Sequence, residues 1–241
     1  MQTAISPSQS AYGRVSLFFF IILLIVQWGF YKTYTIFFPS FTGFKLVQHF
    51  HGTMMMTWMV LLIVQPLLIG TGKISIHKLI GKLSFIIAPL VVISMILVSR
   101  FGYYKPFPPL SHIQRVAAQA LNIPSWIEFV LFYCLAIMNR RNTYDHMRYM
   151  IGTALIMIGP GLGRVLIVYY HLPFPVAVNY GFFYTVIAIT TAFLLNDVIR
   201  KKSHKANAVI LAAFLIHFLL WEFRFYQPWQ GVGEFVANYL F

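Results

Sequence analysis

The chain alternates between long apolar stretches and short polar or basic segments. Each apolar stretch is a continuous run without the alternation of a barrel strand, so each predicts a helix. A bilayer core of about 30 Å needs roughly 20 helical residues. By this measure we expect an all-α fold, a bundle of seven transmembrane helices in a single integral-membrane domain over 1–241. The predicted spans are 15–31, 46–70, 79–98, 123–138, 150–170, 178–195 and 208–223.

Composition supports a polytopic membrane protein. Hydrophobic residues make up 59% of the chain and charged residues only 10%, which excludes an ordinary soluble domain. The net charge of +13 predicts attraction to anionic lipid headgroups of the bilayer and gives no reason to expect nucleic acid as a partner. The single cysteine, Cys134, excludes an intrachain disulfide and a paired-cysteine metal site.

The basic residues are distributed unequally between the two ends of the predicted bundle. With seven spans, the N-terminus and the second, fourth and sixth loops share a side, which holds Arg14, Lys73, Lys78, Lys82, Arg140, Arg141, Arg148, Arg200, Lys201, Lys202 and Lys205. The other side holds Lys32, Lys45, Arg100, Lys105, Arg115, Arg164 and Arg224. Positive charge favours cytoplasmic loops, so we expect a cytoplasmic N-terminus and a multi-pass protein of the cell (inner) membrane. No small-x-small cleavage pattern follows the first apolar run, which predicts a retained helix.

A histidine accompanies basic residues at the tip of each of three predicted helical hairpins. These are His77, His146 and His204, and all three tips should lie on the same face of the membrane. Neutral imidazole is a common ligand of transition metals and haem iron. Three imidazoles from separate hairpins predict a facial metal site. The alternative is that each is an interfacial residue hydrogen-bonded to lipid headgroups.

The second predicted span has polar side chains on one helical face. His51, Met55, Trp58 and Gln65 follow helical spacing, so they should point together into the bundle. His51 is a candidate cofactor ligand, together with His217 of the last span, which lies at a comparable depth. An interhelical hydrogen bond is the alternative for His217.

Ionisable side chains within spans indicate an internal polar site, because charge at apolar depth is unfavourable without a partner. We expect Glu128 and Arg164 to lie at similar depth and to form an ion pair, with either a structural or a functional role. At the level of the three hairpin tips we expect an inner polar layer, which consists of His77, His146, His204, Asp145, Arg148 and Asp197. The run Gly159–Arg164 predicts a kink near the outer third of its span, where the glycines allow close approach of a neighbour.

The chain lacks the residues that would bind retinal or a nucleotide. The last span has no lysine for a retinal Schiff base. Gly70-Thr71-Gly72-Lys73 is followed by Ile74 and has no glycine at the upstream position that a nucleotide-binding phosphate loop requires, so it is not such a loop.

Several motifs together resemble a family of uncharacterised bacterial multi-pass membrane proteins, a domain of unknown function. They are Gly72-Lys73-x-x-x-His77-Lys78-x-x-Gly81 and the helix start His146-x-Arg148-x-Met150. The resemblance extends from the second to the seventh span and implies no activity. The placement of histidines on neighbouring helices also resembles that of bis-histidine haem membrane proteins of the cytochrome b561 and ferric reductase kind.

These patterns favour an integral membrane protein with a histidine-based haem or transition-metal site. It would act in electron transfer, membrane redox chemistry or respiratory-complex biogenesis. The alternative is a non-enzymatic membrane carrier or assembly partner with an internal Glu128–Arg164 site. A third hypothesis is a lipid hydrolase that uses a metal-bound water as nucleophile.

Overall fold

The computed structural model describes residues 9–106 and 109–241. The elements in chain order are α1 (Gln9–Tyr31), η1 (Thr35–Phe37), α2 (Leu46–Gly70), α3 (Ile74–Gly81), α4 (Ser84–Tyr103), α5 (His112–Met138), α6 (Thr143–Leu155), α7 (Ile158–Tyr170), α8 (Phe174–Val178), η2 (Asn179–Tyr184), α9 (Thr185–Ile199), α10 (Lys205–Glu222) and α11 (Gln227–Leu240). Across these two ranges the secondary structure is helical, without strands. The predicted all-α class is confirmed.

Seven helical segments are long and apolar enough to cross a membrane. They are formed by α1, α2, α4, α5, α6 with α7, α8 through α9, and α10. Large apolar side chains such as Leu24, Ile86 and Ile216 are exposed on their outer faces, as lipid contact requires. The protein is therefore a multi-pass helical membrane protein.

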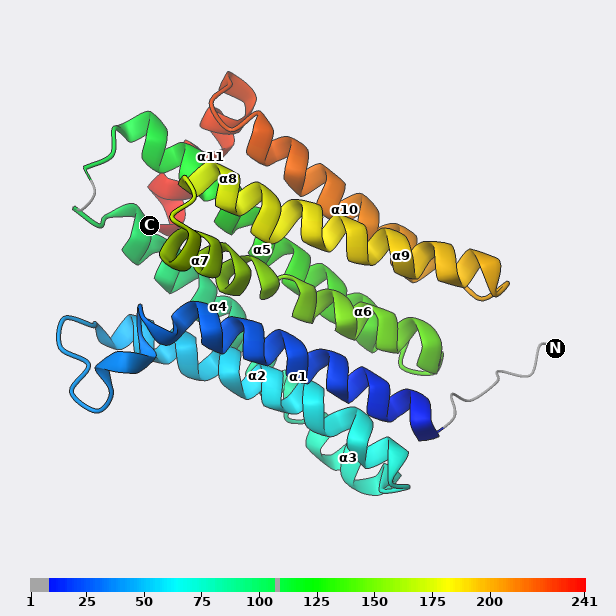
Figure 1. The fold of residues 1–241 in the computed structure, drawn as a ribbon. Coiled ribbons are helices and arrows are strands. Elements are labelled where there is room, and N and C mark those ends of the chain that lie inside the picture. The colour runs from blue at the N-terminus through cyan, green and yellow to red at the C-terminus, as the bar shows by residue number, and fades with distance from the viewer. Residues whose placement is uncertain (1–8, 107–108) are drawn as a thin grey trace.

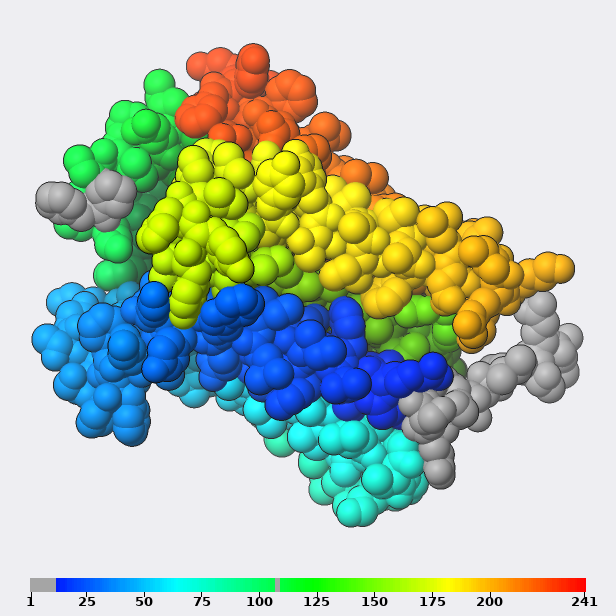
Figure 2. All heavy atoms as spheres, in the orientation of Figure 1, coloured from blue at the N-terminus to red at the C-terminus, as the bar shows by residue number. Residues whose placement is uncertain are grey.

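The segment formed by α6 and α7 lies at the centre of the bundle. Its apolar window is 61% buried, a larger share than in any other spanning segment. It contacts α1, α2, α5, α10 and η2, and α4 joins the outside of α2 and α5. In Figure 2 the side chains of α1 fill the surface next to α9, where the Phe18 and Phe193 ring centroids are 5.7 Å apart.

The three histidine-bearing tips lie at the same end of the bundle, as predicted (Figure 1). We call this the histidine end. It contains the α2–α3 turn with α3, the α5–α6 turn and the α9–α10 turn, and α1 also begins there (Figure 1). The opposite end contains the loop 32–45, α8 and α11.

Two predicted spans have different limits in the structure. The fourth, expected over 123–138, is instead the end of the 27-residue helix α5. Ser111 caps this helix by accepting from the backbone N–H of Gln114 at 3.3 Å. Pro124 lies inside α5, and the helix continues through it. In the third span, expected over 79–98, a break at Lys82–Leu83 separates the short helix α3 from α4.

The central segment is interrupted at Ile156–Met157, immediately before the Gly159–Pro160 pair. The segment is therefore interrupted, but at its middle and not near the outer third of the span as predicted. Close helix contacts follow from the glycines: a Cβ on Gly161 would lie 2.8 Å from Val26 Cα of α1, and one on Gly181 would lie 2.7 Å from the backbone nitrogen of Gly163. Two neighbouring backbones thus approach α7 where it has no side chains.

Helix α11 was not anticipated from the sequence. It packs against α5 and α4 at the end opposite the histidines, and Trp229 Nε1 donates to the Val116 carbonyl at 3.1 Å. Its buried residues are Trp229, Gly233 and Ala237, which are four residues apart and so lie on one face.

Candidate functional site: buried Glu128 and His217

Glu128 and His217 form a hydrogen-bonded pair inside the bundle. Glu128 projects from α5 and is 4% exposed, while His217 projects from α10 and is fully buried. His217 Nδ1 and Glu128 Oε2 are 3.0 Å apart. The rings of Phe182 and Phe183 pack edge-on against the imidazole at 5.3 and 4.9 Å between centroids. A titratable pair is thus enclosed in apolar surroundings.

Each member of this pair keeps one polar atom without a partner. Glu128 Oε1 and His217 Nε2 are both buried and make no hydrogen bond in the described structure. Buried polar atoms in proteins are nearly always hydrogen-bonded, so such exceptions indicate a ligand, a water or a functional proton. Two of them on adjoining side chains make this pair the strongest candidate site.

The predicted ion pair between Glu128 and Arg164 is wrong. Arg164 Nη1 instead donates to the Pro160 carbonyl at 3.0 Å, and its guanidinium carbon lies 4.1 Å from the centre of the Phe30 ring. The cause is the order of the helices. Arg164 lies on the side of α7 that faces α1, whereas Glu128 lies on the side of α5 that faces α10. The two residues were paired because they lie at similar depth, but depth does not show toward which neighbouring helix a side chain points.

His51 forms a separate polar contact between α2 and α4. Its Nδ1 lies 3.1 Å from the Ser94 hydroxyl, which itself donates to the Val91 carbonyl at 2.7 Å. Because the serine has only one proton, His51 Nδ1–H must donate and its Nε2 keeps a lone pair. Figure 1 shows α2 and α10 on opposite sides of the bundle, so His51 and His217 are held by helices that are not neighbours.

Of the face predicted for α2, the inward direction is confirmed for Trp58 by burial and by a hydrogen bond. Trp58 is fully buried, and its Nε1 donates to Thr153 Oγ1 of α6 at 3.2 Å. At the end of the same helix, the Gln65 amide nitrogen donates to the carbonyl and to Nδ1 of His77, and its oxygen accepts from the Gly81 N–H at 3.1 Å. Gln65 therefore fixes α3 against α2 and orients the His77 ring.

His77 and His146 lie near each other at the histidine end. Burial lowers the pKa of His77, and the positive charge of nearby His146 lowers it further. His77 Nδ1 accepts from Gln65, so in the neutral ring its proton is on Nε2. His146 Nδ1 donates to the Ala136 carbonyl at 2.8 Å, which leaves a lone pair on Nε2. His146 thus presents an Nε2 lone pair of the kind that ligates a metal.

The third histidine of this end does not join them. His204 is exposed and immediately precedes α10, and Figure 1 shows the α9–α10 turn on the far side of α6 from α3. Within residues 9–106 and 109–241, no group of three or more histidine, cysteine or acidic side chains is placed to hold a metal ion. The expected convergence of three imidazoles is therefore wrong.

A buried polar network occupies the position between α6, α9 and α10. Asp197 is fully buried, and its Oδ1 accepts from Tyr144 Oη and, at 2.7 Å, from Arg148 Nη2. Its Oδ2 accepts from Asn207 Nδ2 at 2.6 Å. Both carboxylate oxygens are satisfied, and a cationic partner balances the charge. This network connects three helices and contains Arg148, as predicted for the inner polar layer.

Sequence reasoning missed several partners of the residues that it singled out. Tyr144 is four residues before Arg148, and this helical spacing could have indicated that the two meet on one face. Ser94, Asn207 and Phe182 gave no signal, because their importance depends on which helices become neighbours.

Comparison of the chain with protein-family models, with curated proteins and with solved structures finds no match. The resemblance to an uncharacterised family of bacterial membrane proteins therefore stays a prediction. The class of protein is the one that the fold defines, a helical multi-pass membrane protein.

Proposed function

We propose that the protein is a proton-linked carrier of the inner membrane, in which Glu128 and His217 bind the proton. The single observation that supports this is the enclosed pair itself, hydrogen-bonded at 3.0 Å and retaining unpartnered Oε1 and Nε2 atoms. Titratable side chains at apolar depth are unfavourable and are typical of ion and proton pathways.

The chemistry of the pair suits reversible proton binding. A carboxyl and an imidazole joined by one hydrogen bond can share a proton, either as a neutral acid beside a neutral base or as an ion pair. Binding one further proton, or losing one, leaves a net charge in an apolar interior. Such a charge is strongly disfavoured unless the surroundings change. Proton exchange should therefore be linked to a structural change or to entry of a counter-ion.

The interrupted central segment offers the structural element for that link. Phe182 of η2 packs against His217, and a Cβ on Gly159 of α7 would lie 2.8 Å from the Phe182 ring. The same aromatic ring thus contacts both the buried imidazole and the start of α7, next to the break at Ile156–Met157. A shift of α7 would therefore move the Phe182 ring that packs against His217.

The test measures proton flux in liposomes that contain purified protein and an internal pH-sensitive dye. A pH gradient is imposed with Na⁺, K⁺ or chloride as the probe counter-ion. The wild-type protein should collapse the gradient faster than empty liposomes with at least one probe. Glu128→Gln keeps the volume and one hydrogen bond to His217 but cannot exchange the proton, so it should lose the flux, as should His217→Gln.

Matched controls separate this site from general loss of charge. Glu222→Gln and His112→Gln change the same residue types at exposed positions on the same two helices, and both should keep the wild-type rate. Folding is checked by gel filtration and thermal unfolding in detergent. Flux that persists in a folded Glu128→Gln variant would overturn the proposal.

A histidine-bound haem or transition metal is the second candidate, with a role in electron transfer, membrane redox chemistry or respiratory-complex biogenesis. It is supported by His146, whose Nε2 lone pair lies near His77 at the histidine end. Protein expressed with haem and metals supplied should then show a Soret band or bound metal by elemental analysis, and His146→Gln should abolish it. Neither signal in the wild-type protein would remove this candidate.

A further inference from the structure

The exposed side of α5 is apolar over its last three turns, and two arginines follow it. Ile127, Leu131, Cys134 and Met138 are spaced four, three and four residues apart, so they follow one face of the helix. All four side chains are exposed. The turn that follows contains Arg140 and Arg141, also exposed.

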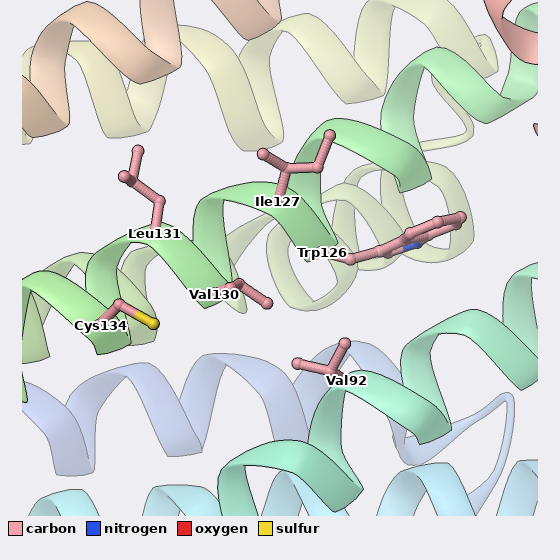
Figure 3. Close-up of a pocket in the computed structure, with 6 residues that line it drawn as sticks. All are labelled: Val92, Trp126, Ile127, Val130, Leu131 and Cys134. Atoms are coloured by element: carbon pink, nitrogen blue, oxygen red, sulfur yellow. The ribbon is translucent and has the colours of Figure 1, made fainter.

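A groove lies along the first part of this face. It has a volume of about 440 Å³ and is lined by Val92 of α4 and by Trp126, Ile127, Val130, Leu131 and Cys134 of α5. Figure 3 shows Val92 and Val130 pointing toward each other across the space between the two helices, with Ile127 and Leu131 projecting from the other side of α5. The lining is apolar throughout, which suits hydrocarbon.

A second hollow, of about 360 Å³, follows one turn further along the same helix. It is lined by Ile137, Met138, Arg140 and Arg141. Within the described residues, neither arginine side chain forms an ion pair, because the two ion pairs are Arg148–Asp197 and His217–Glu128. Unpaired guanidinium groups are suited to phosphate, which they bind in a bidentate manner.

The length of this apolar face matches the depth of one leaflet. Eleven residues separate Ile127 from Met138, which at about 1.5 Å per helical residue is roughly 16 Å. Half of a bilayer core of about 30 Å is roughly 15 Å. The arginines therefore lie at headgroup depth when the groove lies among acyl chains.

We propose that this face of α5 is a binding site for one anionic phospholipid. One acyl chain lies in the groove between α4 and α5, and Arg140 and Arg141 bind the phosphate. Charge complementarity favours an anionic lipid, since the lining contains two cations and no acidic residue. The proposal is independent of the proton site, because Glu128 faces away from this groove toward α10.

The first test is lipid retention by the detergent-purified full chain, measured by native mass spectrometry with phosphatidylglycerol and phosphatidylcholine at equal concentrations. The wild-type protein should retain one phosphatidylglycerol in preference to phosphatidylcholine. Arg140→Gln/Arg141→Gln should reduce that affinity about tenfold or more. Arg200→Gln/Lys201→Gln removes the same charge from another turn at the histidine end and should leave the affinity unchanged. Equal loss in both double variants would show general attraction of headgroups and would overturn the site.

The second test uses Cys134, the only cysteine of the chain. Phosphatidylglycerol should slow its reaction with a maleimide in the wild-type protein, but not in Arg140→Gln/Arg141→Gln. Val130→Trp, which fills the groove between α4 and α5 while keeping both arginines, should weaken lipid retention. Equal protection by phosphatidylcholine would indicate annular lipid only. Protection that depends on protein concentration would indicate a second copy instead. Either result would overturn the proposal.

Discussion

At the residue scale, the negative charge of Asp197 compensates the buried positive charge of Arg148. Arg148 Nη2 donates to Asp197 Oδ1 at 2.7 Å, and the exposed fractions of the two side chains are 10% and 0%. Removing one member of a buried ion pair leaves the other charge uncompensated and costs about 3–5 kcal/mol. Replacing both with apolar residues of similar size is often close to neutral.

We therefore predict that Asp197→Asn lowers the free energy of unfolding by about 3–5 kcal/mol. Arg148→Met/Asp197→Leu should recover much of that loss. Thermal unfolding of both variants in the same detergent measures the difference. A double variant no more stable than Asp197→Asn would mean that the network has a role beyond balancing charge.

The imidazole of His77 gives a pH dependence at the same scale. Burial lowers its pKa in the folded protein from the ordinary value near 6.5, and the charge of His146 lowers it further. Below pH 6.5 the unfolded chain then binds a proton that the folded protein resists. The His77 contribution to stability should fall as the pH drops from 6.5 toward the lowered pKa of the folded state, and should change little below that.

We predict that the unfolding temperature decreases from pH 7.5 to pH 5.5, and that His77→Gln reduces this decrease. His204→Gln is the matched control, because it removes an exposed histidine from the same end of the bundle. Thermal scans of the three proteins at both pH values make the comparison. An identical pH dependence in wild-type and His77→Gln proteins would contradict the proposed effect of burial.

At the element scale, the glycines of α7 determine how closely its neighbours approach. A Cβ on Gly161 would lie 2.8 Å from the Val26 Cα of α1, and a backbone atom cannot move aside as a flexible side chain can. We predict that Gly161→Ala destabilises the protein by about 1–3 kcal/mol, the usual effect of overpacking.

Gly52 of α2 is the matched control for this prediction, since nothing lies within 4 Å of a Cβ built there. Gly52→Ala should be neutral or stabilising by about 0.5–1 kcal/mol, because alanine is the better helix former. Unfolding midpoints in detergent distinguish the two. Equal effects of both substitutions would mean that the α1–α7 contact does not depend on the missing side chain.

Helix positions were predictable from the sequence where they depend on residues within the same helix. They were less predictable where packing against another helix sets the limits. Continuous apolar runs indicated the spans, and the Gly159–Pro160 pair indicated the interruption of the central segment. The fourth span was drawn too short because the polar run Ser111–Arg115 before Ile123 suggested a short interfacial helix lying flat on the membrane surface. In the structure Val116, Ala117 and Ala120 of that stretch are buried, and α11 packs over its start. Because α11 lies more than 100 residues further along the chain, the sequence at the start of α5 does not indicate that α11 will pack on it.

The candidate site was only partly predictable for the same reason. Glu128 and His217 were both identified because ionisable residues at apolar depth are rare. Their pairing was not, since Arg164 at similar depth is the electrostatically better partner for a carboxylate. The order of helices around α6 and α7 decides between them, and it puts α10 beside α5 and α1 beside α7. The three histidine tips likewise share an end, but not a side, of the bundle.

At the scale of the whole molecule, the unequal distribution of basic residues makes a prediction about orientation. The turns of the histidine end contain Lys73, Lys78, Arg140, Arg141, Arg200, Lys201 and Lys202. Cytoplasmic loops are enriched in lysine and arginine, so this end should face the cytoplasm. The proposed lipid site would then lie in the cytoplasmic leaflet, where Arg140 and Arg141 meet the headgroups.

Cysteine accessibility in a Cys134→Ser background tests this orientation. Ser203→Cys places a thiol in the α9–α10 turn of the histidine end, and Ser40→Cys places one in the loop 32–45 of the opposite end; both serines are exposed. In intact cells, a membrane-impermeant maleimide should label Ser40→Cys and leave Ser203→Cys unlabelled until the cells are opened. The reverse pattern would show that the histidine end faces outward. It would then move the proposed lipid site to the outer leaflet.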